Sequence, residues 1–302
     1  MKQKTVSLVL GSGGARGMAH IGVIKCLEEH GYKIESVSGC SMGALVGGFY
    51  AAGKLDNYTE WLRKIDTLDM LKLLDLKGSG GLVSGETLME KMRELVGDPL
   101  IEELPIKFTA VASDVKEEKE IWINRGSLMH AVRASISIPL FFTPHQHIGR
   151  LLIDGGVLNP VPIAPTFDDN TDLTIAVNLG GDIEPNLFPP KKEIDRSVSA
   201  RIKEYLQNIA IPDTIMQEYG MYEIVSQSIE AMQGTIARMK LAAYPPDMVI
   251  EIPRNLCGMM EFNRANEIIE YGYRICGKRL NGGTAGSGVK ALVLTDQLPD
   301  VV

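Results

Sequence analysis

A Gly-x-Ser-x-Gly sequence between a strand-like and a helix-like run constrains the fold of this chain more than any other feature. Residues 34–37 are compatible with a short strand, and the small residues from Ala44 onward predict a helix that packs closely on a sheet. Between them lies Gly39-Cys40-Ser41-Met42-Gly43. In such an elbow the serine takes a strained backbone position, and glycines two residues before and after it, Gly39 and Gly43, avoid Cβ clashes. The pattern predicts a nucleophilic serine, and a tight turn with an idle serine is the alternative.

The rest of the chain alternates between strand-like and helix-like runs. Strands are expected at residues 5–10, 34–38, 106–113, 119–123, 151–153, 173–177 and 247–251. Helices are expected at residues 18–30, 42–52, 88–96, 195–241 with an interruption near 211–213, and 262–280. The βαβα order at the start predicts an α/β fold with parallel strands, joined by right-handed crossovers. Its active site is expected at the carboxyl ends of those strands.

Length and composition exclude several classes of protein. A chain of 302 residues fits one large domain, and 45% hydrophobic with 23% charged residues is typical of a soluble globular protein. A net charge of −7 argues against nucleic acid as a partner. No apolar run approaches the ~20 residues that span a bilayer. The four cysteines lack metal-ligand spacing, so we expect reduced thiols, no metal and a cytoplasmic location.

A second glycine-rich turn, Gly11-Ser12-Gly13-Gly14-Ala15-Arg16-Gly17, follows the first expected strand and opens onto a helix. Its amides could form a phosphate cradle for a nucleotide, but Arg16 stands where the third glycine of that motif belongs and no acidic residue ends the second strand. The amides of Gly13 and Gly14 could instead form an oxyanion hole above Ser41, which the neighbouring elbow favours. A plain structural turn remains the third interpretation.

A base for Ser41 is the next requirement. The chain has five histidines, which are His20, His30, His130, His145 and His147. None follows an acid late in the chain, as the Ser-acid-His order of α/β-hydrolases requires, so that triad is disfavoured. Asp154 ends an expected strand and precedes Gly155 and Gly156, which leave room for a substrate. As a base it needs a pKa raised above its usual value of about 3.9, and a simple Asp-Gly-Gly turn is the alternative.

Two apolar segments have both a structural and a functional interpretation. Residues 57–76 carry apolar side chains at helical spacing, for which core packing is favoured over a lid or membrane-contacting face. Four methionines of the C-terminal helices, Met216, Met221, Met232 and Met239, are expected to fill the core, with an adaptable lipid-binding surface as the alternative. Residues 281–302 begin with a Gly-rich run and are expected to be a flexible tail or an expression remnant.

Three motifs together resemble those of the patatin-like phospholipase family, specifically its small bacterial members similar to the catalytic region of neuropathy target esterase. They are residues 12–17, 39–43 and 154–156, in the family's order, and residues 131–139 and 154–162 also look like the family. The resemblance covers residues 6–180 approximately. It implies a dyad of Ser41 and Asp154 without histidine, and an oxyanion hole at Gly13 and Gly14. Supporting positions are Gly11, Arg16, Gly17, Gly39, Gly43, Gly155 and Gly156.

The resemblance also implies a three-layer α/β/α patatin-like fold with a mainly parallel sheet and a helical C-terminal part. We expect one domain over residues 5–280, with a motif-bearing core at 6–180 and a helical remainder at 190–280. Arg16 either fixes the glycine loop through a salt bridge or meets a phosphate headgroup. One departure is Ser12, because the family's motif often begins with glycine at that position.

The implied activity is that of a serine acyl-ester hydrolase in lipid metabolism, without a cofactor. Its substrates would be phospholipids, lysophospholipids or simpler acyl esters, reached by transient contact with a membrane surface. A catalytically silent lipid- or partner-binding protein on the same fold is the alternative, and a nucleotide-binding protein is the third hypothesis. The oligomeric state is left open.

Overall fold

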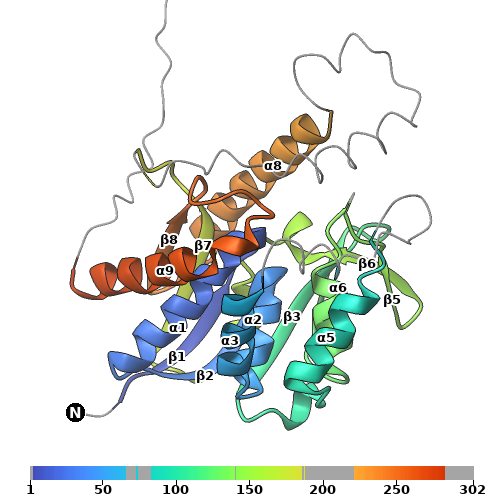
Figure 1. The fold of residues 1–302 in the computed structure, drawn as a ribbon. Coiled ribbons are helices and arrows are strands. Elements are labelled where there is room, and N and C mark those ends of the chain that lie inside the picture. The colour runs from blue at the N-terminus through green and yellow to red at the C-terminus, as the bar shows by residue number, and fades with distance from the viewer. Residues whose placement is uncertain are drawn as a thin grey trace, which may run out of the picture.

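The structure is a computed structural model that describes residues 3–65, 73, 83–139, 141–185, 187 and 221–282 (Figure 1). Its centre is one sheet, in the order β5-β6-β3-β2-β1-β7-β8, with β4 paired to β3. The strands are β1 (Thr5–Leu10), β2 (Lys33–Cys40), β3 (Lys107–Asp114), β4 (Lys119–Ile123), β5 (His145–His147), β6 (Arg150–Asp154), β7 (Leu173–Gly181) and β8 (Met248–Pro253). Strands β3, β2, β1, β7 and β8 are parallel, whereas β4 and β6 are antiparallel to β3.

The helices are α1 (Ala19–Glu29), α2 (Met42–Ala51), α3 (Leu55–Lys64), α5 (Glu86–Val96), α6 (Leu128–Ser135), α8 (Met221–Ala243) and α9 (Ala265–Leu280). A 3-10 helix, η1 (Gly14–Met18), precedes α1. The central strands β1 and β7 are buried on both faces. Leu8 of β1 belongs to the main core, whereas the adjacent Val9 packs with Ala176 of β7 and Ala237 of α8 on the other face. This alternation places the sheet between two layers, as the predicted α/β/α fold requires.

Helices α1 and α9 lie side by side on one face of the sheet (Figure 1). Glycines make their close contact possible. A Cβ atom at Gly22 of α1 would lie 1.9 Å from the carbonyl oxygen of Ile269, and one at Gly272 of α9 would lie 2.1 Å from that of Ala19. Any larger side chain at either position must separate the helices.

Most predicted elements are present within a few residues of their expected ends. Strands β1 and β4 have the predicted bounds. Helix α6 and the short strand β5, which runs from His145 to His147 and pairs antiparallel with β6, were not predicted from the sequence. Three residues are too few for an alternating pattern to be recognised. The long C-terminal helix is described from Met221 onward, and residues 188–220 lie outside the described residues.

Met232 and Met239 of α8 are not core residues, which corrects the sequence-based expectation for these two. Met232 is 58% exposed and Met239 is 66% exposed, because α8 meets the sheet through another side that carries the buried Ala237. Met216 and the side chain of Met221 lie outside the described residues. Among the described helices, none is both long and apolar enough to cross a membrane.

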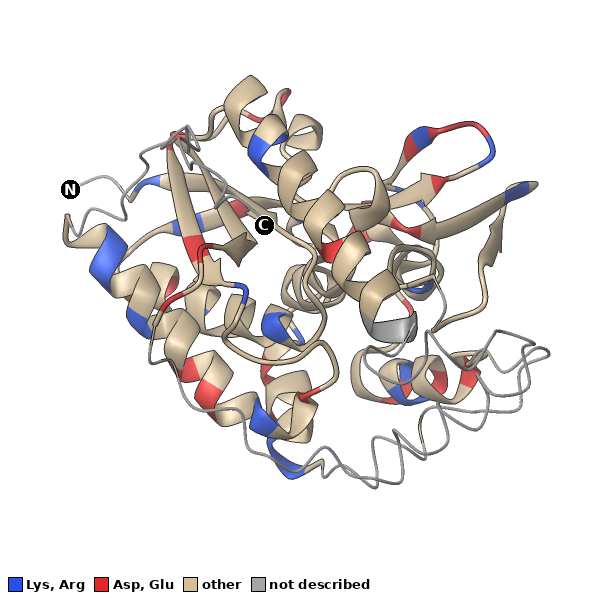
Figure 2. Ribbon diagram, turned by 90° about the horizontal axis from the view of Figure 1, so that it is seen from above, with Lys and Arg blue, Asp and Glu red and all other residues tan. Residues whose placement is uncertain are grey.

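The apolar segment at residues 57–76 is described as far as residue 65, and again at residue 73. In α3, Tyr58 and Leu62 are buried, and the ring of Trp61 stacks on that of Tyr58 with centroids 5.8 Å apart. Core packing is therefore confirmed for α3. The alternative of a lid at residues 57–76 and the flexible tail at 281–302 stay untested, since residues 66–72, 74–76 and 283–302 lie outside the described residues. Acidic and basic residues are interspersed along the described helices and loops (Figure 2).

Candidate active site

Ser41 lies between the end of β2 at Cys40 and the start of α2 at Met42. Its backbone has φ 54° and ψ −127°, a combination that non-glycine residues rarely adopt. Such strain persists only where the surrounding structure enforces it, and it is typical of functional positions. The predicted elbow is therefore present, with Ser41 at its apex.

The two glycines of the elbow are required by close backbone contacts. A Cβ atom at Gly39 would lie 2.4 Å from the carbonyl oxygen of Gly43, and one at Gly43 would lie 2.0 Å from that of Leu10. Both distances are too short for a methyl group, since packed carbon and oxygen atoms stay more than 3 Å apart. Glycine at these positions lets α2 start directly against β1 and β2.

Ser135, in the last turn of α6, fixes the backbone of the elbow through a hydrogen bond to Ser41. Its hydroxyl accepts a hydrogen bond from the Ser41 N–H at 2.9 Å and donates one to the carbonyl oxygen of Val111 at 2.6 Å. Ser135 is fully buried. No role for Ser135 could be predicted from the sequence, although it lies in the family-like run 131–139, because nothing in that pattern indicates that this serine reaches residue 41.

Asp154 is the last residue of β6, which pairs with β3 next to β2. Its N–H donates to the carbonyl oxygen of Ser137 at 2.9 Å, and its Oδ1 accepts a hydrogen bond from the Gly156 N–H at 2.7 Å. Asp154 is 2% exposed and Ser41 is 1% exposed. The structure thus brings the two residues together at one edge of the sheet, in a site closed to solvent.

Burial raises the pKa of Asp154 to about 6, although the Ser41 side chain and the Gly156 N–H each lower it. The effect of Ser41 on this pKa indicates that the two side chains are neighbours. Oδ2 of Asp154 nevertheless has no hydrogen-bond partner with good geometry among the described residues. The Ser41 hydroxyl is therefore close to the Asp154 carboxyl group without a well-aligned hydrogen bond to it, as often occurs before substrate binds.

The glycine loop lies between β1 and η1 and is held by its backbone. The N–H groups of Gly11, Ser12 and Ala15 donate to the carbonyl oxygens of Val177, Pro160 and Met259, at 3.1, 2.9 and 2.9 Å. The amides of Gly13 and Gly14, by contrast, have no acceptor in the part of the chain that the structure describes. Two unpaired N–H groups in succession can bind an anionic oxygen.

Arg16 of η1 is buried, and its guanidinium holds the glycine loop. It donates to the carbonyl oxygen of Gly13 at 3.2 Å, to that of Arg254 at 2.9 Å and to Oε1 of Glu230 at 2.7 Å. Of the two roles considered for Arg16, the geometry supports the structural salt bridge. Each of its three nitrogens already has a partner within the protein.

The remaining glycines of the three motifs are Gly11, Gly17, Gly155 and Gly156, and they pack between neighbouring parts of the site. A Cβ atom at Gly17 would lie 2.3 Å from that of Met42, which follows Ser41. One at Gly156 would lie 2.5 Å from the Ser12 hydroxyl. The three motifs therefore converge on one place.

None of the described histidines is in a position to act as the base for Ser41 through a direct hydrogen bond. His20 of α1 is the nearest in sequence to the glycine loop, with Nε2 2.9 Å from the carbonyl oxygen of Gly11, and burial lowers its pKa to about 4. No described histidine hydrogen-bonds to Ser41 or Asp154. Within the described ranges, no group of three or more His, Cys, Asp or Glu side chains could hold a metal ion.

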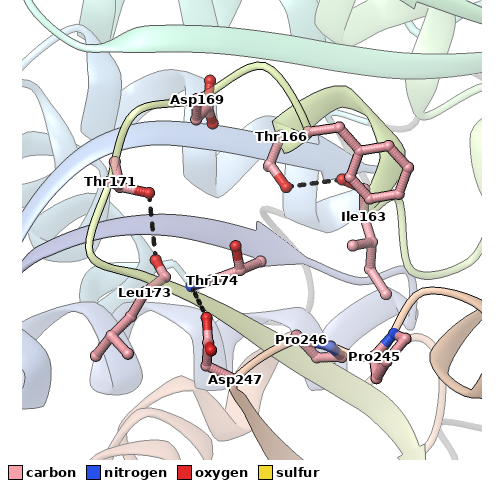
Figure 3. Close-up of a pocket in the computed structure, with 10 residues that line it drawn as sticks. Ile163, Thr166, Asp169, Thr171, Leu173, Thr174, Pro245, Pro246 and Asp247 are labelled. Carbon is pink, nitrogen blue, oxygen red and sulfur yellow. Dashed lines mark hydrogen bonds between the residues drawn. The ribbon is translucent and has the colours of Figure 1, made fainter.

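A surface pocket lies at the opposite end of the sheet (Figure 3). It is lined by Thr171, Leu173 and Thr174 at the start of β7, and by Pro245, Pro246 and Asp247 just before β8. Thr174 donates its N–H to Oδ2 of Asp247 at 2.7 Å across it. Since Ser41 follows the carboxyl end of β2, this pocket is not part of the candidate site.

Known proteins are similar to this chain over most of its length. An NTE family protein of Mycobacterium tuberculosis is 39% identical over 88% of this chain and 89% of its own. Patatin-like phospholipase domain-containing protein 6 of Homo sapiens is 27% identical over 97% of this chain, which spans only 21% of the human protein. The crystal structure of VipD from Legionella pneumophila aligns with 93% of this chain and 67% of its own, at 15% identity and a TM-score of 0.45.

The sequence model described as Patatin-like phospholipase matches residues 8–167, which is more than half of the chain. That range begins in β1 and contains the glycine loop, the elbow and the Asp-Gly-Gly motif. The chain therefore belongs to the patatin-like phospholipase family.

Proposed function

We propose that this protein is a serine acyl-ester hydrolase in which Ser41 is the nucleophile and Asp154 is the base. Membership of the patatin-like phospholipase family supports lipid acyl hydrolase activity in general. The observation that carries the finer proposal is the strained serine of the elbow beside a buried carboxyl group whose pKa is raised to about 6. A carboxylate with this pKa is ionised at neutral pH and is a better proton acceptor than an exposed aspartate.

In this mechanism the Ser41 Oγ attacks the ester carbonyl carbon while its proton passes to Oδ2 of Asp154, the oxygen without a partner among the described residues. The oxyanion that forms accepts hydrogen bonds from the amides of Gly13 and Gly14, which also lack another acceptor there. Asp154 then gives the proton to the leaving alcohol. A water molecule, deprotonated by Asp154, attacks the acyl-enzyme, and Asp154 returns that proton to the Ser41 Oγ as the acid is released.

The substrates that we propose are phospholipids, lysophospholipids or simpler acyl esters, and the protein needs no cofactor for this reaction. The name of the human relative, a patatin-like phospholipase domain-containing protein, supports a lipid ester substrate. We further propose a cytoplasmic protein that contacts membrane surfaces transiently. Because the dyad is nearly inaccessible here, substrate entry requires local opening around the site.

The test is hydrolysis of p-nitrophenyl acyl esters by the wild-type protein and by Ser41→Ala and Asp154→Asn. Both variants should lose at least about a thousandfold in kcat/KM, because a nucleophile and its base act as one unit. Ser38→Ala is the matched control, because Ser38 is another buried serine of the same segment whose hydroxyl has no partner among the described residues. Full turnover by Ser41→Ala would overturn the assignment. Lipid binding without turnover by the wild-type protein would favour the silent binding protein.

A further inference from the structure

The glycine loop is tied to a helix that lies outside the range matched by the family model. Oε1 of Glu230, on α8, is 2.7 Å from a guanidinium nitrogen of Arg16. The Arg16 side chain is only 6% exposed, whereas that of Glu230 is 35% exposed. The ion pair therefore runs from the protein surface inward to the loop that contains the two unpaired amides.

One peptide group connects this ion pair with the proposed oxyanion hole. Arg16 donates through Nε to the carbonyl oxygen of Gly13. That carbonyl shares a planar peptide group with the N–H of Gly14, and in a trans peptide the two point in opposite directions. A guanidinium that fixes the Gly13 oxygen on one side therefore also fixes the direction of the Gly14 N–H on the other.

The loop needs such a fixed partner because its own residues give little rigidity. Two successive glycines have access to far more backbone conformations than other residues, so the peptide between Gly13 and Gly14 could rotate at low energetic cost. The guanidinium of Arg16, by contrast, is anchored at its two terminal nitrogens, by Glu230 and by the Arg254 carbonyl oxygen. Without Glu230 its buried charge would have no carboxylate partner among the described residues, and it would move toward water or another acceptor.

We propose that Glu230 is a positioning residue for ester hydrolysis, which acts through Arg16 to keep the Gly14 N–H directed at the oxyanion. This inference rests on the proposed function and deepens it. Glu230 itself touches neither the substrate nor the dyad. It makes α8 part of the catalytic apparatus, although α8 carries none of the three motifs.

Kinetics of Glu230→Ala and Glu230→Gln test the proposal on p-nitrophenyl esters. We expect Glu230→Ala to lower kcat about tenfold, less than the loss on removing an oxyanion donor outright, with KM changed by no more than about twofold. Glu230→Gln should recover part of the loss, since its amide oxygen can still accept from Arg16. The midpoint of the pH profile should not move, because the surroundings of Asp154 are unchanged.

Amide hydrogen exchange, followed by mass spectrometry, reports on the loop independently of activity. Glu230→Ala should exchange several-fold faster than wild type in peptides covering residues 11–18 and equally in those covering residues 39–45. Lys240→Gln is the matched control, because Lys240 forms another ion pair of α8, with Glu120, and does not contact Arg16. It should leave exchange in residues 11–18 unchanged.

Either of two results would overturn the role of Glu230. One is exchange in residues 11–18 that is unaffected by Glu230→Ala, and the other is an equal acceleration by Lys240→Gln, which would indicate general loosening of α8. If the wild-type protein hydrolyses no ester, the proposed function fails. Faster loop exchange in Glu230→Ala alone would still support the positioning of the Gly13–Gly14 peptide by this residue.

Discussion

Single residues decide the chemistry of this site, and Asp154 is the one whose surroundings matter most. Its carboxyl group is buried at the end of β6, accepts one backbone hydrogen bond and leaves Oδ2 without a partner among the described residues. Burial keeps its pKa at about 6, between that of a free aspartate and that of a typical histidine. This explains in physical terms how a base other than histidine could serve Ser41.

The pH dependence of hydrolysis follows from this pKa. Asp154 accepts a proton only when it is ionised, so kcat/KM should be low at pH 5, half-maximal near pH 6 and constant above pH 7. Initial rates on a p-nitrophenyl ester between pH 4.5 and 8.5 measure the profile. A midpoint near 4 would mean that Asp154 is not desolvated in the working enzyme.

Asp154→Asn should make the folded protein more stable although it lowers the hydrolytic activity. The pKa of the folded protein lies above the ordinary value of 3.8, so the folded state favours the protonated form, and ionising Asp154 destabilises the fold as pH rises from 4 to above 6. Asparagine removes the charge and can still accept from Gly156. At pH 8 the variant should gain up to roughly 3 kcal/mol in the free energy of unfolding.

Urea unfolding at pH 8 and at pH 4.5 measures this difference. The gain should be largest at pH 8 and should nearly disappear at pH 4.5, where wild-type Asp154 is protonated too. A variant that is less stable than wild type at pH 8 would contradict the desolvation of this carboxyl group.

The hydroxyl of Ser135 should matter more than that of another buried serine. Ser135→Ala removes the acceptor of the Ser41 N–H and leaves that group unpaired in the interior, which destabilises the fold by about 1–3 kcal/mol. Ser38→Ala removes a hydroxyl without a partner in the described structure and should be nearly neutral. Thermal unfolding of the two variants compares them, and equal losses would contradict the role given to Ser135.

At the scale of the elements, the helix pair α1 and α9 depends on glycine. Gly272→Ala would place a Cβ 2.1 Å from the Ala19 carbonyl oxygen, so α9 must shift and the protein should lose about 2 kcal/mol or more. A Cβ atom added by Gly277→Ala on the same helix would have only the Cys26 sulfur within 4 Å, at 3.9 Å. Because alanine has a higher helix propensity than glycine, this variant should gain up to about 1 kcal/mol in the free energy of unfolding. The melting temperatures of the two variants, compared with that of the wild type, measure these effects. A shift of both in the same direction would contradict the close contact of α1 and α9.

Elements with a regular pattern could be predicted from the sequence, and those made by tertiary contacts could not. The apolar residues of Thr5–Leu10 and of Lys119–Ile123 predicted β1 and β4. Strand β5 has three residues and exists through its pairing with β6. The exposure of Met232 depends on which side of α8 meets the sheet, and composition does not reveal that side.

At the scale of the whole molecule, the motifs of the first half depend on the second half. The three motifs could be recognised because each is a short run with a local backbone requirement, as at Gly39 and Gly43. Three of the residues that hold the glycine loop, Glu230, Arg254 and Met259, lie more than 200 residues later in the chain. None of these three residues belongs to a motif, so only the folded structure reveals them.

The most direct measurement is covalent labelling of the folded protein with a fluorophosphonate, followed by peptide mass spectrometry. A nucleophilic Ser41 should carry a single phosphonyl adduct, absent from Ser41→Ala and formed much more slowly in Asp154→Asn. Ser38→Ala should be labelled at the wild-type rate. An adduct on another residue, or no adduct on a protein whose fold is intact by circular dichroism, would contradict the assignment of Ser41 as the nucleophile.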